Sequence, residues 1–409
     1  MSYATTRIPC LDGLRGLAAL GVVLFHFNVF FLPQARLPFV SKAYLAVDFF
    51  FMLSGFVMAH VYGRLLAKNW RLHALRFARA RFARLYPLFA VTTLTMAMVF
   101  ALSDLPLNLV SFSGGSLALQ PFLLQQWAPG LSWDYPSWSI STEAEAYVFF
   151  VFCSGLLLAG KYPRLIATGC IAILAALSLR HSGSLNSFVG ISALLRTLAE
   201  FSLGMLLYRA HSADLEFPSW LTASLSVVFA GLATITRLDL LMVAAFGCLI
   251  YYSARNTTDR VGKLLNSRPL VALGNWSYSI YLWHAPGHYA VMAAFAFIGY
   301  PVTQLGLASS RLLLFTTALA VVVLSAFHYR YFETPCRRFL LGYRFFSTAS
   351  TIHGLQPPCP VVAGSGDQAH PVAVALQPEA VTVELDLVTP IRNVVSTRRN
   401  AKNKRTYPT

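Results

Sequence analysis

Charged residues are scarce in this chain of 409 residues, and acidic residues are the scarcest of them. Asp and Glu number 16 against 32 Lys and Arg, and the four types together make up 12% of the sequence, where roughly 25% is usual. This shortage excludes an ordinary soluble domain. The apolar content of 56% and the mean hydropathy of +0.58 instead indicate a polytopic membrane protein.

Cysteine is also sparse, and none of the six cysteines forms a CxxC pair. Neither a metal site nor a disulfide framework is therefore predicted. A cleavage pattern of small residues is missing after the first apolar run, which we interpret as a retained span rather than a signal peptide. The net charge of +16 lies in short clusters between apolar runs, as topology signals do, so we predict a membrane partner and no nucleic acid.

Apolar runs of about 15 to 25 residues predict an all-α membrane protein with about ten transmembrane helices around a polar intramembrane cavity. Lys and Arg concentrate in the even-numbered loops, which carry 14 of them against 4 in the odd-numbered loops. This asymmetry predicts that both termini are cytoplasmic. The ten predicted spans are 11–31, 44–62, 87–103, 138–159, 165–179, 188–208, 219–236, 239–253, 270–298 and 306–332.

Two segments outside the predicted spans have distinct compositions. Residues 104–137 contain no Lys or Arg and carry Trp133 and Tyr135 as interfacial anchors, which fits an external loop. Residues 345–409 are rich in Pro, Ser, Gly and Val without helical periodicity, and they end in a basic run. We therefore predict one transmembrane domain over 1–344 and a disordered basic tail over 345–409 that contacts anionic lipid.

The first apolar run carries an arginine and a histidine, Arg15 and His26. Eleven residues at about 100° each return the second side chain to within roughly 20° of the first, so both lie on one helix face. Arg15 can reach the interface, but His26 lies about three turns deeper, where an ionisable group is costly unless it lines a polar cavity. The pair is a candidate site; the alternative is a histidine that bonds a neighbouring helix as packing.

The second run carries Asp48 near its external end and a small-residue patch at Ser54 and Gly55. A carboxylate within the membrane needs a partner, and His26 is predicted at comparable depth in the neighbouring span. Ser54 and Gly55 are predicted to let another helix approach closely.

A basic face follows between the second and third runs, formed by Arg76, Arg79, Arg81 and Arg84 with apolar residues between them. This amphipathic pattern is typical of a segment at the cytoplasmic surface. Two roles remain open: a topology signal that contacts lipid headgroups, or a clamp for the phosphates of a cofactor such as coenzyme A.

Two carboxylates lie at the start of the fourth run, Glu143 and Glu145. They point about 200° apart on a helix, so at most one can face the same cavity as His26. We favour Glu143, which lies one turn from Ser139. For Ser139 itself, a capping or structural role is the alternative.

The ninth run carries a polar stripe of Ser277, Tyr281 and His284 with i, i+4, i+7 spacing, followed by Pro286, which is predicted to kink the helix. Polar side chains inside lipid must face protein or water. The stripe is therefore either an interhelical contact or the lining of a path for an acceptor substrate.

Six blocks of this sequence, in order, resemble the motifs of the integral-membrane acyltransferase-3 family, which includes O-acetyltransferases of bacterial lipopolysaccharide, exopolysaccharide and nodulation factors. The resemblance runs from about residue 8 to 340, and it departs from the family pattern at Ala144, which replaces a frequent second Glu, and at Ala146, which replaces an aromatic residue. The blocks are LDGLRGLAALGVVLFHF, VDFFFMLSGF, RFARARFARLYP, WSISTEAEAYV, LGNWSYSIYLWHAP and YRYFETPCRRF.

The resemblance implies a multi-pass enzyme of the bacterial inner membrane. It would transfer an acyl group, with acetyl favoured, from cytoplasmic acyl-CoA to a hydroxyl of a surface or exported glycan. The acyl-CoA would be a substrate rather than a tightly bound cofactor, and no metal is expected. Membrane lipids and proteins of polysaccharide synthesis are the expected partners.

The same resemblance suggests roles for the candidate residues. The phosphates of the donor would dock on Arg76, Arg79, Arg81 or Arg84. Arg15 would orient the donor or stabilise developing charge, and His26 would act as general base or as transient acyl carrier. Glu143 or Asp48 would hold the tautomer of the imidazole.

Two other functions fit a chain of ten spans. A transporter or exporter of a lipid-linked saccharide would also carry polar stripes and interior charges, but carriers often show matching halves, and the sequence has no clear internal repeat. A non-catalytic scaffold of a polysaccharide-synthesis complex has no need of a histidine deep in the membrane. We therefore favour the acyltransferase.

Overall fold

The structure is a computed structural model that describes residues 7–32, 37, 40–103, 114–128, 132–186, 189–236 and 238–342. The predicted tail over 345–409 lies outside the described residues. Within these ranges every regular element is a helix, which confirms the all-α prediction.

Most long helices follow the predicted spans closely, but α3 begins at Arg64 rather than near residue 87. Two π-helices, η3 (Ala59–Gly63) and η9 (Tyr329–Glu333), continue directly into α-helices. The α-helices are α1 (Pro9–Phe31), α2 (Ala46–Met58), α3 (Arg64–Leu102), α4 (Gly114–Leu119), α5 (Trp138–Ala159), α6 (Pro163–Arg180), α7 (Gly190–Ser212), α8 (Ser219–Thr236), α9 (Asp239–Arg255), α10 (Arg260–Leu265), α11 (Arg268–Phe297), α12 (Leu307–His328) and α13 (Thr334–Gly342).

Seven helical segments in the described part of the chain are long and apolar enough to cross a membrane. The predicted spans 44–62 and 87–103 correspond to parts of one segment, Ala43–Leu102, whose helix is kinked at Asn69 by non-helical backbone angles. The predicted spans 239–253 and 270–298 correspond to α9 and α11, which are not among the seven. The structure therefore supports a multi-pass membrane protein, and the number of ten spans stays a prediction.

Local sequence explains where several helices begin. Proline stands in the first turn of α1, α6 and α11, where its missing N–H costs nothing and its fixed φ suits the helix. Asp259 precedes α10 and accepts a hydrogen bond of 2.6 Å from the backbone N–H of Gly262, as an N-cap does.

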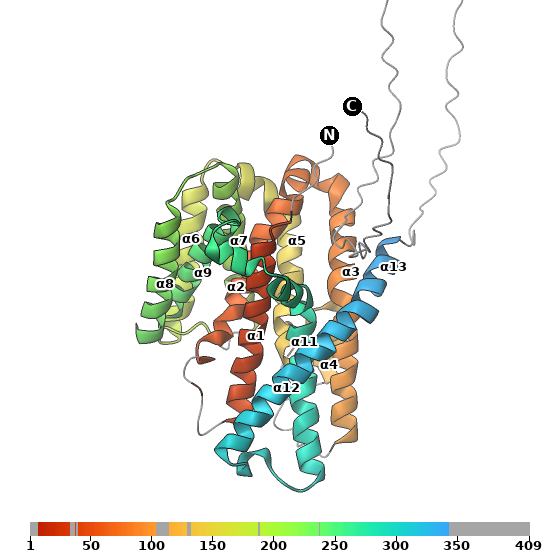
Figure 1. The fold of residues 1–409 in the computed structure, drawn as a ribbon. Helices are drawn as coiled ribbons and strands as arrows, with labels where there is room; N and C mark the ends of the chain where they lie inside the picture. The colour runs from red at the N-terminus through yellow and green to blue at the C-terminus, as the bar shows by residue number, and fades with distance from the viewer. Residues whose placement is uncertain are drawn as a thin grey trace, which may run out of the picture. The chain divides into compact units, whose positions relative to one another are not determined.

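Helix α1 packs against α2, α11 and α12, and α6, α8 and α9 lie along one side of this group (Figure 1). The approach of α1 to α11 is close because Gly274 faces the backbone of α1. A methyl group on Gly274 would lie 2.0 Å from the carbonyl oxygen of Asp12, so no larger residue fits there. This contact fixes the helix that carries Arg15 against the helix that carries Tyr281.

Helices α2 and α7 pack in the same way. A methyl group on Gly55 would lie 2.0 Å from the carbonyl oxygen of Phe201, and one on Gly204 would lie 1.9 Å from that of Met52. The prediction that Gly55 lets another helix approach closely is therefore confirmed, and the partner is α7.

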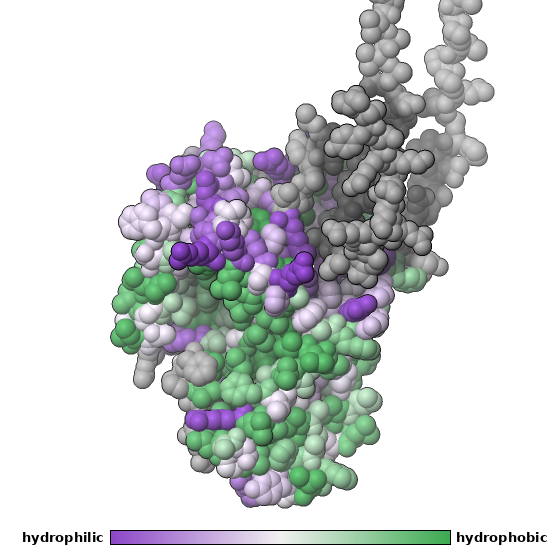
Figure 2. All heavy atoms as spheres, in the orientation of Figure 1, coloured by the Kyte–Doolittle hydropathy of each residue, from purple (hydrophilic) through white to green (hydrophobic). Residues whose placement is uncertain are grey.

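A broad belt of hydrophobic residues covers the visible face of the molecule, next to an end where hydrophilic side chains gather (Figure 2). Large apolar side chains are exposed on α6, α8 and α12, among them Leu165, Val227 and Leu319. Contiguous exposed apolar surface of this kind marks contact with lipid or protein, and it agrees with the spans that hydropathy predicts.

Candidate active site

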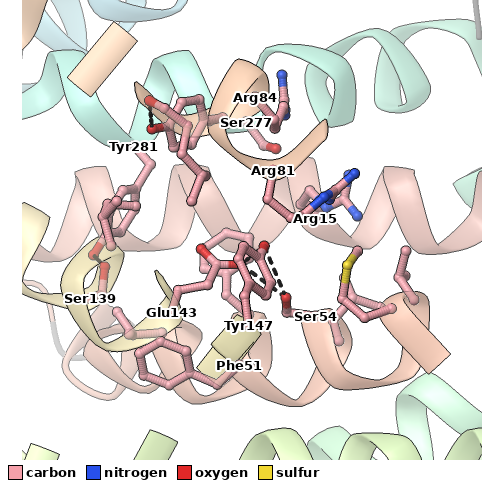
Figure 3. A pocket seen from close by; sticks show the side chains of 18 residues that line it. Arg15, Phe51, Ser54, Arg81, Arg84, Ser139, Glu143, Tyr147, Ser277 and Tyr281 are labelled. Atoms are coloured by element: carbon pink, nitrogen blue, oxygen red, sulfur yellow. Dashed lines mark hydrogen bonds between the residues drawn. The ribbon is translucent and has the colours of Figure 1, made fainter. Parts of the chain in front are cut away.

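A pocket of about 140 Å³ lies between α1, α2, α3, α5 and α11 (Figure 3), and we call it the central pocket. One face of α2 lines it from Val47 to Met58, which is about 16 Å of helix at 1.5 Å per residue. The pocket is therefore a narrow channel along α2 rather than a round cavity.

Three arginines, Arg15, Arg81 and Arg84, line one part of the central pocket (Figure 3). Arg84 forms a buried ion pair with Glu333 of η9, and its guanidinium lies 5.2 Å from the ring of Tyr278. The guanidinium groups of the three arginines are planar and donate several hydrogen bonds each, so they suit the phosphate oxygens of a ligand.

The other two arginines of the pocket have different partners. Arg15 pairs with Asp12 at 3.3 Å, one turn earlier on α1. Arg81 lies over the rings of Tyr62 and Tyr147, at 5.5 and 5.9 Å from their centroids. The tyrosines position Arg81 without supplying a carboxylate, which leaves its charge available to an anion.

The basic face predicted on α3 divides into two halves. Arg81 and Arg84 line the central pocket, whereas Arg76 and Arg79 do not. Arg79 donates hydrogen bonds of 2.7 to 3.1 Å to the carbonyl oxygens of Leu340 and Leu341 at the end of α13. Arg79 therefore supports α13, and Arg76 is exposed on the surface of α3.

The two carboxylates of α5 point to opposite sides, as their spacing predicts. Glu143 lines the central pocket and accepts hydrogen bonds from Ser54 at 2.9 Å and from Tyr147 at 2.6 Å. Glu145 accepts a hydrogen bond of 2.6 Å from the indole of Trp127, on the side away from the pocket. Ser54 is thus a polar partner of Glu143 rather than part of a packing patch.

The polar stripe of α11 also divides. Ser277 and Tyr281 line the central pocket, and the hydroxyl of Ser277 donates to the carbonyl of Gly274 at 2.8 Å. His284 is fully buried one turn beyond Tyr281 and does not line the pocket. Its Nδ1 donates a hydrogen bond to the carbonyl of Tyr281.

His26 lies outside the central pocket, beside His284. The two imidazole rings stack with centroids 4.9 Å apart and an angle of 28° between their planes. Nδ1 of His26 lies 3.0 Å from the carbonyl oxygen of Val22, and because a carbonyl can only accept, this nitrogen carries the proton. The lone pair of neutral His26 is therefore on Nε2, the arrangement that a general base requires.

This hydrogen bond changes the explanation of how the imidazole is oriented. We expected Glu143 or Asp48 to hold its tautomer, but Glu143 bonds Ser54 and Tyr147, and the Val22 carbonyl occupies Nδ1 of His26.

Asp48 is placed differently from the prediction that made His26 its partner. It receives two hydrogen bonds from the guanidinium of Arg196 on α7, one of them 2.8 Å long, and its side chain is completely buried. Glu200, one turn further along α7, lies 3.7 Å from the same guanidinium. Asp48 thus belongs to a buried ion cluster between α2 and α7, and no ion pair joins it to His26 in the described residues.

The turn before α5 adds two residues to the surroundings of His26. The ring of Tyr135 lies 5.0 Å from that of His26 and 5.6 Å from that of His284. Asp134 precedes Tyr135 and its side chain is completely buried. The backbone carbonyl of Asp134 begins the turn by accepting a hydrogen bond of 2.8 Å from the backbone N–H of Ser137. Burial raises the pKa of Asp134 to about 8, so its carboxyl group is largely neutral at pH 7.

Several of these residues were not predicted as site residues. The sequence predicts Tyr135 only as an interfacial anchor, and it assigns no site role to Arg196 or to Glu333 of the block YRYFETPCRRF. A signal for Arg196 existed, since an arginine followed by Glu200 at i+4 inside an apolar run indicates an interior ion pair. No group of three or more His, Cys, Asp or Glu side chains in the described ranges is placed to bind a metal ion.

Comparison with known families gives a match to an acyltransferase domain over residues 8–330. This range contains all five helices that line the central pocket. The chain belongs to this acyltransferase family. The membership confirms the predicted resemblance and favours the enzyme over the transporter and the scaffold.

Similar proteins include the O-acetyltransferase OatA of Staphylococcus aureus (strain NCTC 8325 / PS 47), 23% identical over 84% of this chain and 59% of its own length. The peptidoglycan O-acetyltransferase OatA of Listeria monocytogenes is 23% identical over 82% of this chain and 57% of its own length. Protein 2 in the picA locus of Rhizobium radiobacter is 48% identical over 23% of this chain and 46% of its own length.

The chain thus spans about three fifths of the two O-acetyltransferases that it matches. No solved structure matches this chain.

Proposed function

We propose that this protein is a membrane O-acetyltransferase that moves an acetyl group from cytoplasmic acetyl-CoA to a hydroxyl of a cell-surface or exported glycan. The observation that carries the proposal is the central pocket, lined by Arg15, Arg81 and Arg84 in a chain of the acyltransferase family. The names of the two bacterial relatives support acetyl as the group and a glycan as the acceptor.

The direction of transfer rests on the sequence. With ten spans and both termini in the cytoplasm, as the Lys and Arg asymmetry predicts, the start of α1 and the basic face of α3 lie on the cytoplasmic side. The donor would enter there with its phosphates near Arg81 and Arg84. Arg76, exposed on the same helix, would attract the donor, and Arg79 is occupied by α13.

The far end of the central pocket favours a small uncharged acyl group. Val47, Phe50 and Ile140 line the pocket together with the hydroxyl groups of Ser139 and Tyr281. A free carboxylate on the acyl group, as in succinyl, would lose its hydration in this part of the pocket without a cationic partner, which is costly. Acetyl-CoA is therefore the donor that we propose.

His26 would act in the chemical step, beside His284 on the predicted path of the acceptor substrate. As general base, Nε2 of His26 takes the proton of the acceptor hydroxyl while the oxygen of that hydroxyl attacks the thioester carbon. The carbon–sulfur bond then breaks, and the CoA thiolate takes up the proton to leave as the thiol. In the alternative, His26 carries the acetyl group before the hydroxyl attacks. Arg15 orients the donor or stabilises the developing oxyanion in either case.

Acetylation of surface glycan by cells that produce His26→Ala or Arg15→Ala protein tests the proposal. We expect His26→Ala to lose about 100-fold or more of the acetyl transfer, the usual contribution of a general base, and Arg15→Ala to lose a similar factor. His73→Ala and Arg180→Ala change the same residue types outside the pocket and should retain transfer. Membrane levels of each variant, measured by immunoblot, normalise the rates. Near-normal acetylation by both site variants would refute the proposal.

A further inference from the structure

Tyr281 lies between the central pocket and the two stacked histidines. Its side chain lines the pocket together with Ser139, at the end opposite to the arginines (Figure 3). Its ring centroid is 5.8 Å from that of His284, which stacks on His26. Neither histidine lines the pocket. A thioester in the pocket therefore meets Tyr281 before it meets His26.

Hydrogen bonds hold the Tyr281 side chain in this position. Its hydroxyl lies 2.7 Å from the hydroxyl of Ser139 and donates to the carbonyl of Pro136 at 2.9 Å. Ser139 and Tyr281 are each buried, and the ring of Phe50 packs edge-on against Tyr281 at 6.0 Å. The Ser139 hydroxyl also lies 3.1 Å from the same Pro136 carbonyl. With Tyr281 donating to Pro136, the Ser139 proton is shared between that carbonyl and the Tyr281 oxygen.

These contacts link α11 to the start of α5 rather than stabilising either helix internally. Pro136 lies in the turn that also carries Tyr135, whose ring contacts both His26 and His284. A movement of this turn that frees the Tyr281 hydroxyl would therefore also move a side chain that contacts the two imidazole rings. The same turn therefore contacts Tyr281, which lines the central pocket, and the pair of stacked histidines.

We propose that Tyr281 is a positioning residue whose bonds to Ser139 and Pro136 keep the donor thioester apart from His26 until an acceptor hydroxyl arrives. This inference rests on the proposed function. In the closed state the thioester remains on the arginine side, where His26 cannot activate water against it. When Tyr281 moves, the acceptor oxygen bonds to the thioester carbon, the carbon–sulfur bond breaks, and the hydroxyl proton passes through His26 to the thiolate. Exclusion of water until that moment prevents loss of the acetyl group by hydrolysis.

Removal of one hydroxyl group should weaken the closed state by a measurable factor. Tyr281→Phe keeps the ring against Phe50 and His284 but loses both hydrogen bonds. Since one or two buried hydrogen bonds shift an equilibrium about tenfold, we expect hydrolysis of acetyl-CoA to rise about tenfold. Ser139→Ala removes one of the two contacts, so we expect a smaller rise in the same direction.

The experiment uses the full-length protein in proteoliposomes with acetyl-CoA. Release of CoA thiol without any acceptor gives the hydrolysis rate, and acetyl esters on the surface glycan of producing cells give the transfer rate. Tyr278→Phe is the matched control because Tyr278 also lines the pocket, whereas its hydroxyl donates to the carbonyl of Leu85 at 2.6 Å and not to the turn before α5. The expected result is a ratio of hydrolysis to transfer that rises in Tyr281→Phe and Ser139→Ala and not in Tyr278→Phe.

Each other outcome has a definite meaning. If Tyr281 has a purely structural role, Tyr281→Phe will lower hydrolysis and transfer together. An unchanged ratio of hydrolysis to transfer in an active protein would refute the separation of the donor thioester from His26, but not the proposed function. An equal rise in Tyr278→Phe would also refute it, since any loss of a pocket hydroxyl would then have the same effect. Wild-type protein that neither releases thiol nor acetylates glycan would refute the proposed function and this inference with it.

Discussion

Replacing Asp48 by Asn would leave the guanidinium of Arg196 buried beside α2 without its bidentate carboxylate partner. The side chains of Arg196 and Asp48 are 3% and 0% exposed, so solvent cannot replace the lost charge. Removal of one partner of a buried ion pair typically costs about 3–5 kcal/mol. At roughly 2–4 °C per kcal/mol, the scale for domains of 150–250 residues, we expect Tm to fall by about 10 °C.

Thermal unfolding of the detergent-solubilised protein and acetyl transfer per folded molecule are the two measurements. Asp48→Asn should lower Tm and retain transfer at a temperature where it is folded. Glu200 is also buried against Arg196, so the variant that combines Asp48→Leu, Arg196→Met and Glu200→Gln removes all three ionisable groups of the cluster. This triple variant should recover most of the lost stability, because no ion is left buried alone.

Asp214→Asn is the control for these variants, since Asp214 pairs with Arg255 at 3.7 Å but is 90% exposed, and it should leave Tm unchanged. Asp48→Asn protein with wild-type Tm and the same loss of transfer as His26→Ala would refute this reasoning and place Asp48 in the chemistry.

Two further predictions concern the arginines of α3 and the turn before α5. Arg84→Gln should raise KM for acetyl-CoA about tenfold or more, which is the effect of losing a hydrogen bond to a charged group. Arg79→Gln should leave KM at the wild-type value. Equal KM changes in the two variants would contradict the division of the basic face. Asp134 has its pKa raised from 3.8 to about 8, so the unfolded chain releases this proton first and stability should fall by up to about 1.4 kcal/mol per unit as pH rises from 4 to 8. Asp134→Asn should lose that part of the pH dependence of Tm, and the same slope in the variant would show that Asp134 does not cause it.

The helices and the small-residue contacts were predictable from local sequence. Apolar runs fix where the long helices lie, because backbone groups in lipid must bond within their own segment. The 100° advance per residue separates Glu143 from Glu145, and the structure has them on opposite sides of α5. Gly55 needed only the rule that small residues allow close approach, although the sequence did not name α7 as the partner.

The partners of the charged residues were not predictable in this way. Asp48 and Arg196 are 148 positions apart, and periodicity places each on a helix face without saying which face it meets. The four arginines of α3 look equivalent in sequence, but the docking of α13 assigns Arg79 to the carbonyl groups of Leu340 and Leu341.

The relation of His26 to the pocket depends on a similar long-range contact. The spacing predicts that Arg15 and His26 share one face of α1. In the structure Arg15 lines the pocket and His26 does not, because Tyr281 reaches Ser139 between them.

Transfer of a labelled acetyl group by the purified protein tests the central claim most directly. Proteoliposomes would hold the chain in one orientation, with acetyl-CoA labelled in its acetyl group on the side of the α3 arginines and surface glycan from producing cells on the other. We predict labelled acetyl esters on the glycan that require His26 and appear only when the donor is on that side. Glycan that stays unlabelled while the protein is folded and the donor is intact would contradict the account.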